Sequence, residues 1–145
     1  MIDRLSIDKS VNENLIPKID QTKFLGLDNS NAGRIELFMF ALALGVKKGY
    51  RTPLAAKHGF ILESAIGSDY LSMIDSLHVN EVRKTNEDEL IGDKESAFSI
   101  AQEYANTGFQ EISAWITEHG NDDEGTAWQL IAEMNEEFEH LTNIF

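Results

Sequence analysis

Glu137 and His140 form a short motif whose residue types and spacing suit metal chemistry. The E-x-x-H spacing places a carboxylate and an imidazole on one helix face, as in di-iron helical bundles. Such a bundle needs two of these motifs and two further glutamates, all directed into the core, and the sequence holds one motif. The buried face of this helix is expected to be formed by the apolar neighbours Met134, Phe138 and Leu141, which leaves Glu137 and His140 mostly outward. We therefore interpret this segment as a solvated acidic helix and expect neither a metal nor a cofactor.

The rest of the sequence shows no catalytic signature. The acidic run 122–124 lacks the spaced oxygens and central glycine of a calcium loop. No serine lies in a G-x-S-x-G motif, and neither a P-loop nor a dinucleotide-binding motif is present. The chain has no cysteine, which excludes disulfides, thiolate metal sites and cysteine nucleophiles. We interpret the protein as non-enzymatic, and a hydrolase or nuclease site assembled from distant residues is the open alternative.

Basic residues gather around an aromatic side chain in the stretch KKGYRTPLAAK. Arginine and lysine beside an aromatic suit contact with phosphate or nucleic acid, and they suit an acidic protein surface equally well. A second interpretation stays open, in which these residues pair with the acidic body of the same molecule. The candidate binding residues are Lys47, Lys48, Tyr50, Arg51 and Lys57.

The charge of the chain is divided unevenly. The 145 residues contain 12 Lys and Arg and 25 Asp and Glu, a net charge of −13. Residues 1–60 carry nine bases and six acids, a net +3, whereas residues 61–145 carry three bases and 19 acids, a net −16. The overall charge disfavours non-specific binding to nucleic acid or an anionic membrane. The asymmetry favours an electrostatic protein partner or self-association, although an acidic surface that only confers solubility would show it too.

The hydrophobic spacing predicts a central helix over residues 32–45. Ile35, Phe38 and Leu42 follow the spacing of three or four residues, and other apolar residues fill the remaining sides. A helix that is apolar nearly all round is surrounded by protein. Gly45 is predicted to end this helix. The apolar run here is half the length that a membrane-spanning helix needs.

The same spacing predicts an all-α fold for the rest of the chain, with a small β hairpin within residues 46–67 as the exception. Asp93 can cap a helix whose apolar face continues to residue 105, and the Asn-Thr-Gly sequence at 106–108 is predicted to break it. Further helices are predicted around apolar residues at 70–77, 109–116 and 127–141. We expect a common core of Phe38, Leu42, Ile100, Trp115, Ile131 and Phe138.

We interpret residues 1–145 as a single domain. A loosely structured N-terminal segment over residues 1–29 is the alternative for the start of the chain.

Two segments carry a resemblance to a known family. Residues 40–54, FALALGVKKGYRTPL, resemble a segment of small proteins encoded beside bacterial DNA phosphorothioation (Dnd) systems, of the Dnd-associated protein 4 type. Residues 103–112, EYANTGFQEI, are similar to the same group. The resemblance implies an accessory role in a defence system that distinguishes self from foreign DNA, and it implies no catalytic residues.

Together these observations predict a cytoplasmic interaction module. Its expected partner is a protein component of a DNA-modifying or DNA-cleaving complex, with no direct binding to nucleic acid or membrane. The alternative is an acidic protein that mimics nucleic acid and inhibits a nuclease or a DNA-binding protein. Homo-oligomerisation is compatible with either interpretation.

Overall fold

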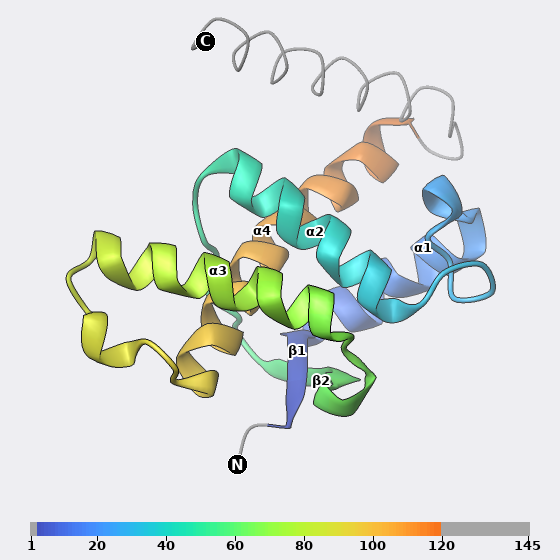
Figure 1. The fold of residues 1–145 in the computed structure, drawn as a ribbon. Helices are drawn as coiled ribbons and strands as arrows, with labels where there is room; N and C mark the ends of the chain where they lie inside the picture. The colour runs from blue at the N-terminus through green and yellow to red at the C-terminus, as the bar shows by residue number, and fades with distance from the viewer. Residues whose placement is uncertain (1–2, 120–145) are drawn as a thin grey trace, which may run out of the picture.

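The structure, a computed structural model, describes residues 3–119 and is mainly α-helical, which confirms the predicted fold class. Helices α2, α3 and α4 form the body of the molecule, and α4 crosses behind α2 in Figure 1. The elements are β1 (Arg4–Asp8), a π-helical turn (Val11–Leu15), α1 (Ile16–Thr22), α2 (Arg34–Lys48), β2 (Lys57–Leu62), α3 (Ser68–Lys84) and α4 (Lys94–His119). Short 3-10 turns cover Phe24–Gly26, Glu63–Ala65 and Asp88–Leu90.

The two strands form a small antiparallel sheet, but the sheet is not a local hairpin. Strand β2 lies within residues 46–67, as predicted, and its partner β1 comes from the N-terminal segment. The pairing runs from Arg4 opposite Leu62 to Asp8 opposite Lys57, with an irregularity after Leu5. Leu5 and its neighbours on the inner face are buried, so the sheet packs onto the core. The prediction of a local hairpin was wrong about the partner strand, because pairing over this sequence distance leaves no local signal.

The N-terminal segment is regularly folded and packs on the core. Residues 4–22 form β1, the π-helical turn and α1, whereas the mixed sequence allowed a loosely structured segment. The apolar side chains spaced by four, Val11, Leu15 and Ile19, are all buried. Their burial provides the hydrophobic stabilisation that holds this segment on the core.

Helices α2 and α4 approach each other closely at two glycines. Gly45 of α2 lies against the backbone carbonyl of Tyr104, and Gly108 of α4 lies against the backbone carbonyl of Ala41. A methyl group on either glycine would collide with the facing helix. The two predicted helix ends at these glycines were therefore wrong. Helix α2 continues to Lys48 and ends at Gly49, whose φ of +85° is left-handed, and α4 runs unbroken through residues 106–108.

The predicted faces of the helices are mostly buried. Phe38, Leu42, Ile100 and Trp115 lie in one core, while the two other predicted core residues, Ile131 and Phe138, lie outside the described residues. Asp93 caps α4, because its Oδ1 accepts a hydrogen bond from the Ser96 N–H at 3.2 Å. In α3 the prediction was wrong at one position: Met73 is 56% exposed.

The outer side of α2 departs from the prediction of a helix surrounded by protein. Ile35 and Met39 are half-buried, Ala43 is exposed, and Val46 is 42% exposed. The buried side faces α4, while Ile35 and Met39 pack only partly against the core. Across this described part of the chain, no helix combines the length and hydropathy needed to span a membrane.

Candidate functional site

The basic segment, residues 47–57, begins in the last turn of α2 and then runs along α4 as an extended connection to β2. Side chains of α4 hold its backbone. The Thr107 hydroxyl donates to the Tyr50 carbonyl at 2.9 Å, and the Asn106 amide Nδ2 donates to the Thr52 carbonyl at 3.1 Å. A further hydrogen bond, at 2.8 Å, joins the hydroxyls of Thr52 and Thr107. The part of this connection around Tyr50 and Thr52 is therefore fixed to α4.

Asp8 fixes the far end of the same connection. Its Oδ1 accepts hydrogen bonds from the backbone N–H groups of Ala55 and Ala56, at 2.7 and 3.2 Å. The hydroxyl of Ser10 donates to Oδ2, and this hydrogen bond is the largest of the effects that hold the pKa of the Asp8 carboxyl below its usual value. Asp8 is 7% exposed, so the end of β1 and the end of the basic segment form one buried polar junction.

Two of the predicted binding residues pair with acids of α4. The Lys48 ammonium lies 3.2 Å from Glu111 Oε1, and the Arg51 guanidinium lies 3.4 Å from Glu103 Oε1. Each basic side chain is about a third exposed, as expected for ion pairs at a surface. For these two residues the structure shows the internal pairing that the sequence left as the alternative.

The other predicted binding residues are at the surface. Tyr50 is 60% exposed and follows directly on α2, next to Lys47 and Lys48. Lys57 is exposed as well, but it starts β2 at the opposite end of the connection. The structure thus gathers Lys47, Lys48, Tyr50 and Arg51 at the end of α2 and places Lys57 apart from them.

The two segments that carried the family resemblance lie against each other. Residues 40–54 contribute Gly45 and the start of the basic segment, and residues 103–112 contribute Tyr104 and the side chains that hold it. Sequence reasoning missed the anchoring residues Asn106 and Thr107. Their spacing could have identified them. Asn106 and Thr107 follow Glu103 by three and four residues, which places the three polar side chains on one face of an otherwise apolar helix.

A buried histidine and a serine form a further contact that the sequence did not indicate. Nε2 of His78 in α3 lies 3.0 Å from Oγ of Ser96 in α4. His78 lines a cavity of about 440 Å³ beside the ion pair of Glu63 and Lys94, whose atoms are 2.8 Å apart. Ser96 lines a separate cavity of about 220 Å³. Because the two side chains line different cavities, a substrate in one cavity would not meet both, and we interpret their contact as a structural hydrogen bond.

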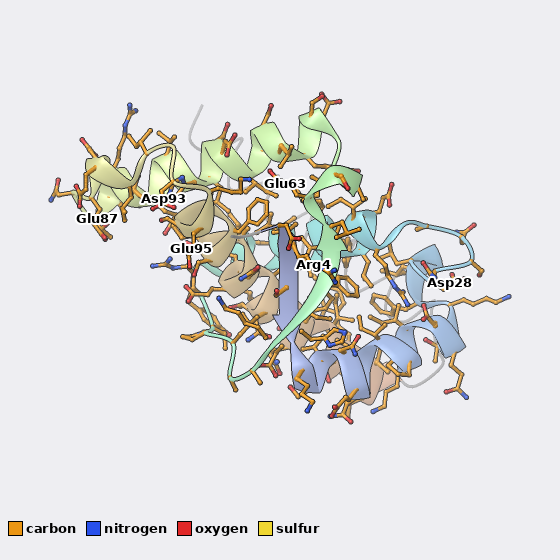
Figure 2. All side chains as sticks on the ribbon, turned by 90° about the horizontal axis from the view of Figure 1, so that it is seen from below. Arg4, Asp28, Glu63, Glu87, Asp93 and Glu95 are labelled. Atoms are coloured by element: carbon orange, nitrogen blue, oxygen red, sulfur yellow. The ribbon has the colours of Figure 1, made fainter. Side chains whose placement is uncertain are left out.

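Acidic side chains gather at the connection between α3 and α4. Figure 2 shows Glu87, Asp93 and Glu95 at this end of the molecule, away from Arg4 and Asp28. Glu87, Asp93 and Glu95 are exposed. Among residues 3–119, no group of three or more His, Asp or Glu side chains could hold a metal ion. The E-x-x-H motif and the acidic run after residue 120 lie outside this range.

Comparison with known proteins gives a family match. A family model described as DNA sulphur modification system-associated protein 4 matches residues 27–144. No curated protein and no solved structure matches the chain. The matched span contains α2, α3 and α4, and with them both helices that meet at the paired glycines.

Proposed function

The chain belongs to the DNA sulphur modification system-associated protein 4 family, and from this we propose that it is a non-enzymatic cytoplasmic module that binds a protein component of that system. The proposed contact is the surface around Tyr50 in the basic segment. The family description supports an accessory role beside a DNA sulphur modification system. The choice of a protein partner rests on charge, because a net charge of −13 opposes contact with DNA.

The observation that carries this proposal is an exposed tyrosine on a backbone that is already fixed. Tyr50 is 60% exposed, while its carbonyl oxygen is held by Thr107. A fixed backbone loses little conformational entropy on binding, and tyrosine and arginine are common among residues that dominate interface affinity. Arg51 and Lys48 lie beside Tyr50 and are each 36% exposed while paired with Glu103 and Glu111. A partner with acidic groups around an apolar pocket fits this surface.

The test is binding to each purified component of the DNA sulphur modification system from the same host. Tyr50→Ala should weaken binding to one component by roughly tenfold or more, since it removes a central aromatic contact. Met73→Ala is the matched control, because Met73 is an equally exposed apolar residue on α3. Undiminished binding of Tyr50→Ala to every component that the parent protein binds would contradict the proposal.

A second candidate function, mimicry of nucleic acid, is favoured by the exposed acids between α3 and α4. Exchanging Glu87 and Glu95 for glutamine and Asp93 for asparagine, which can still cap α4, should then abolish binding to a nuclease or DNA-binding protein. Tyr50→Ala would leave that binding intact. The two proposals therefore predict opposite results for the same pair of variants.

A further inference from the structure

Strand β2 pairs with β1 on one side and has no partner strand on its other side among residues 3–119. We call this other side of β2 the open edge. The outer side of β1 differs, because the Ser6 N–H there donates to the Gln102 side chain of α4 at 2.7 Å. An unpaired strand edge presents backbone N–H and C=O groups that can pair with another strand.

A hydrogen bond at one end of the ladder shows which residues of β2 face the open edge. The Lys9 N–H donates to the Ala56 carbonyl at 2.8 Å. Residues that lie directly opposite each other in an antiparallel ladder alternate between hydrogen-bonded and non-hydrogen-bonded pairs. Lys57, the next residue inward, therefore directs its N–H and C=O groups away from β1. The same holds for Gly59, two residues further on and opposite Ser6.

The other end of the ladder gives the same result for Leu62. The Glu63 N–H donates to the Asp3 carbonyl at 2.8 Å, so the neighbouring Leu62 directs its N–H and C=O groups outward. Lys57 and Gly59 are exposed, and Leu62 is 48% exposed. Because glycine has no side chain, the exposure of Gly59 is exposure of the backbone itself. Within the described part of the chain, no backbone group pairs with the outward groups of these three residues.

We propose that an extended, acidic segment of another protein pairs with the open edge as a third strand of this sheet. Lys57 forms no ion pair within residues 3–119. Arg4 lies on the same face of the sheet, and a β-carbon on Gly59 would lie 2.9 Å from Cδ of Arg4. The Arg4 side chain is 55% exposed, with Asp3 at 3.8 Å. A strand that pairs with Lys57 and Gly59 places alternate side chains beside these two cations, and carboxylates fit there.

The acids nearest to the open edge leave room for this partner. Asp8 lies opposite Lys57 in the ladder, but it is buried and accepts hydrogen bonds from backbone N–H groups. Glu63 lies 2.8 Å from Lys94. Residues 37–62 contain no Asp or Glu, although the chain has 25 of them. An acidic strand therefore meets less repulsion here than along the acidic remainder of the chain.

The same charges argue against a second copy of this chain at the open edge. Two β2 strands running antiparallel about a two-fold axis at His58 would pair Lys57 of each copy with Gly59 of the other. Each Lys57 would then lie beside Arg4 of the other copy, and like charges on neighbouring strands repel each other. An acidic segment replaces this repulsion with attraction.

Leu62→Pro removes one N–H group from the open edge without straining the strand. Leu62 has a φ of −67°, which is the value that the proline ring imposes, and its N–H group is not used in pairing with β1. The preceding residue, Ile61, is in extended strand conformation, as a residue before proline requires. Leu62→Ala is the matched control, because it shortens the same side chain and keeps the N–H group. Both variants should stay folded.

The probe is a short blocked peptide in which glutamate and valine alternate, titrated into the full-length protein and followed by NMR. A peptide with lysine in place of glutamate is its control. The acidic peptide should bind with a dissociation constant of about 1 mM or lower, and the basic peptide roughly tenfold more weakly. Leu62→Pro should weaken binding of the acidic peptide by roughly fivefold relative to Leu62→Ala, because one backbone hydrogen bond is lost.

Charge reversal tests the chemistry of the partner. Lys57→Glu should weaken binding of the acidic peptide by roughly tenfold, because it exchanges attraction for repulsion at the open edge. Lys84→Glu makes the same change in net charge at the end of α3 and should leave this binding unchanged. Equal effects of the two variants would mean that the peptide responds to overall charge and would overturn the proposed site.

Hydrogen exchange of the free protein gives a further test. The outward amides of Lys57, Gly59 and Leu62 should exchange quickly in the free protein and more slowly with the acidic peptide bound. Protection of these amides before any peptide is added would assign the open edge to residues 120–145, or to a second copy if the protection rises with protein concentration. Either result would overturn the proposal.

Two binding results would also overturn the proposal. The first is the absence of binding by the acidic peptide, and the second is equal binding to Leu62→Pro and Leu62→Ala. The open edge is separate from the surface around Tyr50, so Tyr50→Ala should leave peptide binding unchanged. The contact at Tyr50 and the contact at the open edge can therefore fail independently.

Discussion

Gly45 of α2 lies directly against the backbone carbonyl of Tyr104 in α4. Four residues away on each helix, Ala41 and Gly108 repeat the arrangement with the roles exchanged. The absence of two side chains therefore sets how closely α2 and α4 approach each other.

Gly45→Ala should destabilise the fold even though alanine favours a helix. The added methyl group has no room beside the Tyr104 carbonyl, and overpacking of this kind costs about 1–3 kcal/mol. Unfolding in urea measures the loss. Gly67→Ala is the control, since Gly67 precedes α3 with open space around it and an ordinary φ of −67°. Equal stability of the two variants would contradict the close contact.

Asp8→Asn should destabilise the protein by about 1–3 kcal/mol at neutral pH, because the charged acceptor of two backbone N–H groups is lost. The hydrogen bonds of Asp8 lower its folded-state pKa below the usual value of 3.8. A lowered pKa contributes stability above the unfolded-state value and loses it as the pH falls through the folded-state value.

The stability difference between Asp8→Asn and the parent protein should therefore be constant above about pH 5 and shrink steadily below pH 4. Urea titrations at a series of pH values provide the measurement. A difference that stayed constant down to pH 2 would show that the Asp8 carboxylate is not preferentially stabilised in the folded state.

Thr107→Val should loosen the basic segment while leaving α4 folded. The variant keeps the shape of the side chain but loses the hydrogen bonds to the Tyr50 carbonyl and to the Thr52 hydroxyl, at a cost of about 1 kcal/mol. The Thr52 amide, which donates to the Glu103 carbonyl at 3.1 Å, should then exchange its hydrogen faster. Unchanged exchange at Thr52 would mean that Thr107 does not hold this connection.

Phe38→Ala should cost about 3–5 kcal/mol, because Phe38 is fully buried in the contact between α2 and the core. Tyr50→Ala should change the free energy of unfolding by about 0.5 kcal/mol or less, since Tyr50 is exposed. Denaturant unfolding of both variants checks the assignment. A large loss of stability in Tyr50→Ala would give this residue a structural role and remove it from the candidate contact surface.

The buried faces of the helices could be predicted from the sequence, but two of the helix ends could not. One side of α4 is buried, and a helix with one buried side carries apolar residues at the helical period. The apolar residues of α4 follow this period: Ala97, Ile100, Ala101 and Ala105. A glycine is ambiguous, because it can end a helix or admit a close neighbour. At Gly45 the outcome depends on α4, which lies some sixty residues further along the chain, and no local pattern reports on that contact.

The residue types of the candidate site could be predicted from the sequence, but the hydrogen bonds and ion pairs that hold these residues in place could not. Lys47, Lys48 and Tyr50 stand out as a basic and aromatic group against an acidic chain. Asp8, by contrast, cannot be distinguished in the sequence from the other acids of the mixed N-terminal stretch. Its hydrogen bonds to Ala55 and Ala56 span 47 and 48 residues, so no local pattern indicates them. The internal ion pairs of Lys48 and Arg51 are equally non-local. The sequence therefore could not show whether these two side chains pair within the molecule or are available to a partner.

The hydrogen bond from the Ser6 N–H to the Gln102 side chain joins residues 96 positions apart, and it sets an order of events during synthesis. Strand β1 is synthesised before the other elements of the described part of the chain, yet the Ser6 N–H has no Gln102 acceptor until α4 has been made. At about 5–20 residues per second, Leu5 and Ile7 wait for about 5–20 s without their final cover. Strand β1 is therefore secured only after α4 has been made, and a nascent chain that stalls before α4 leaves the side chains of Leu5 and Ile7 open to other molecules in the cell.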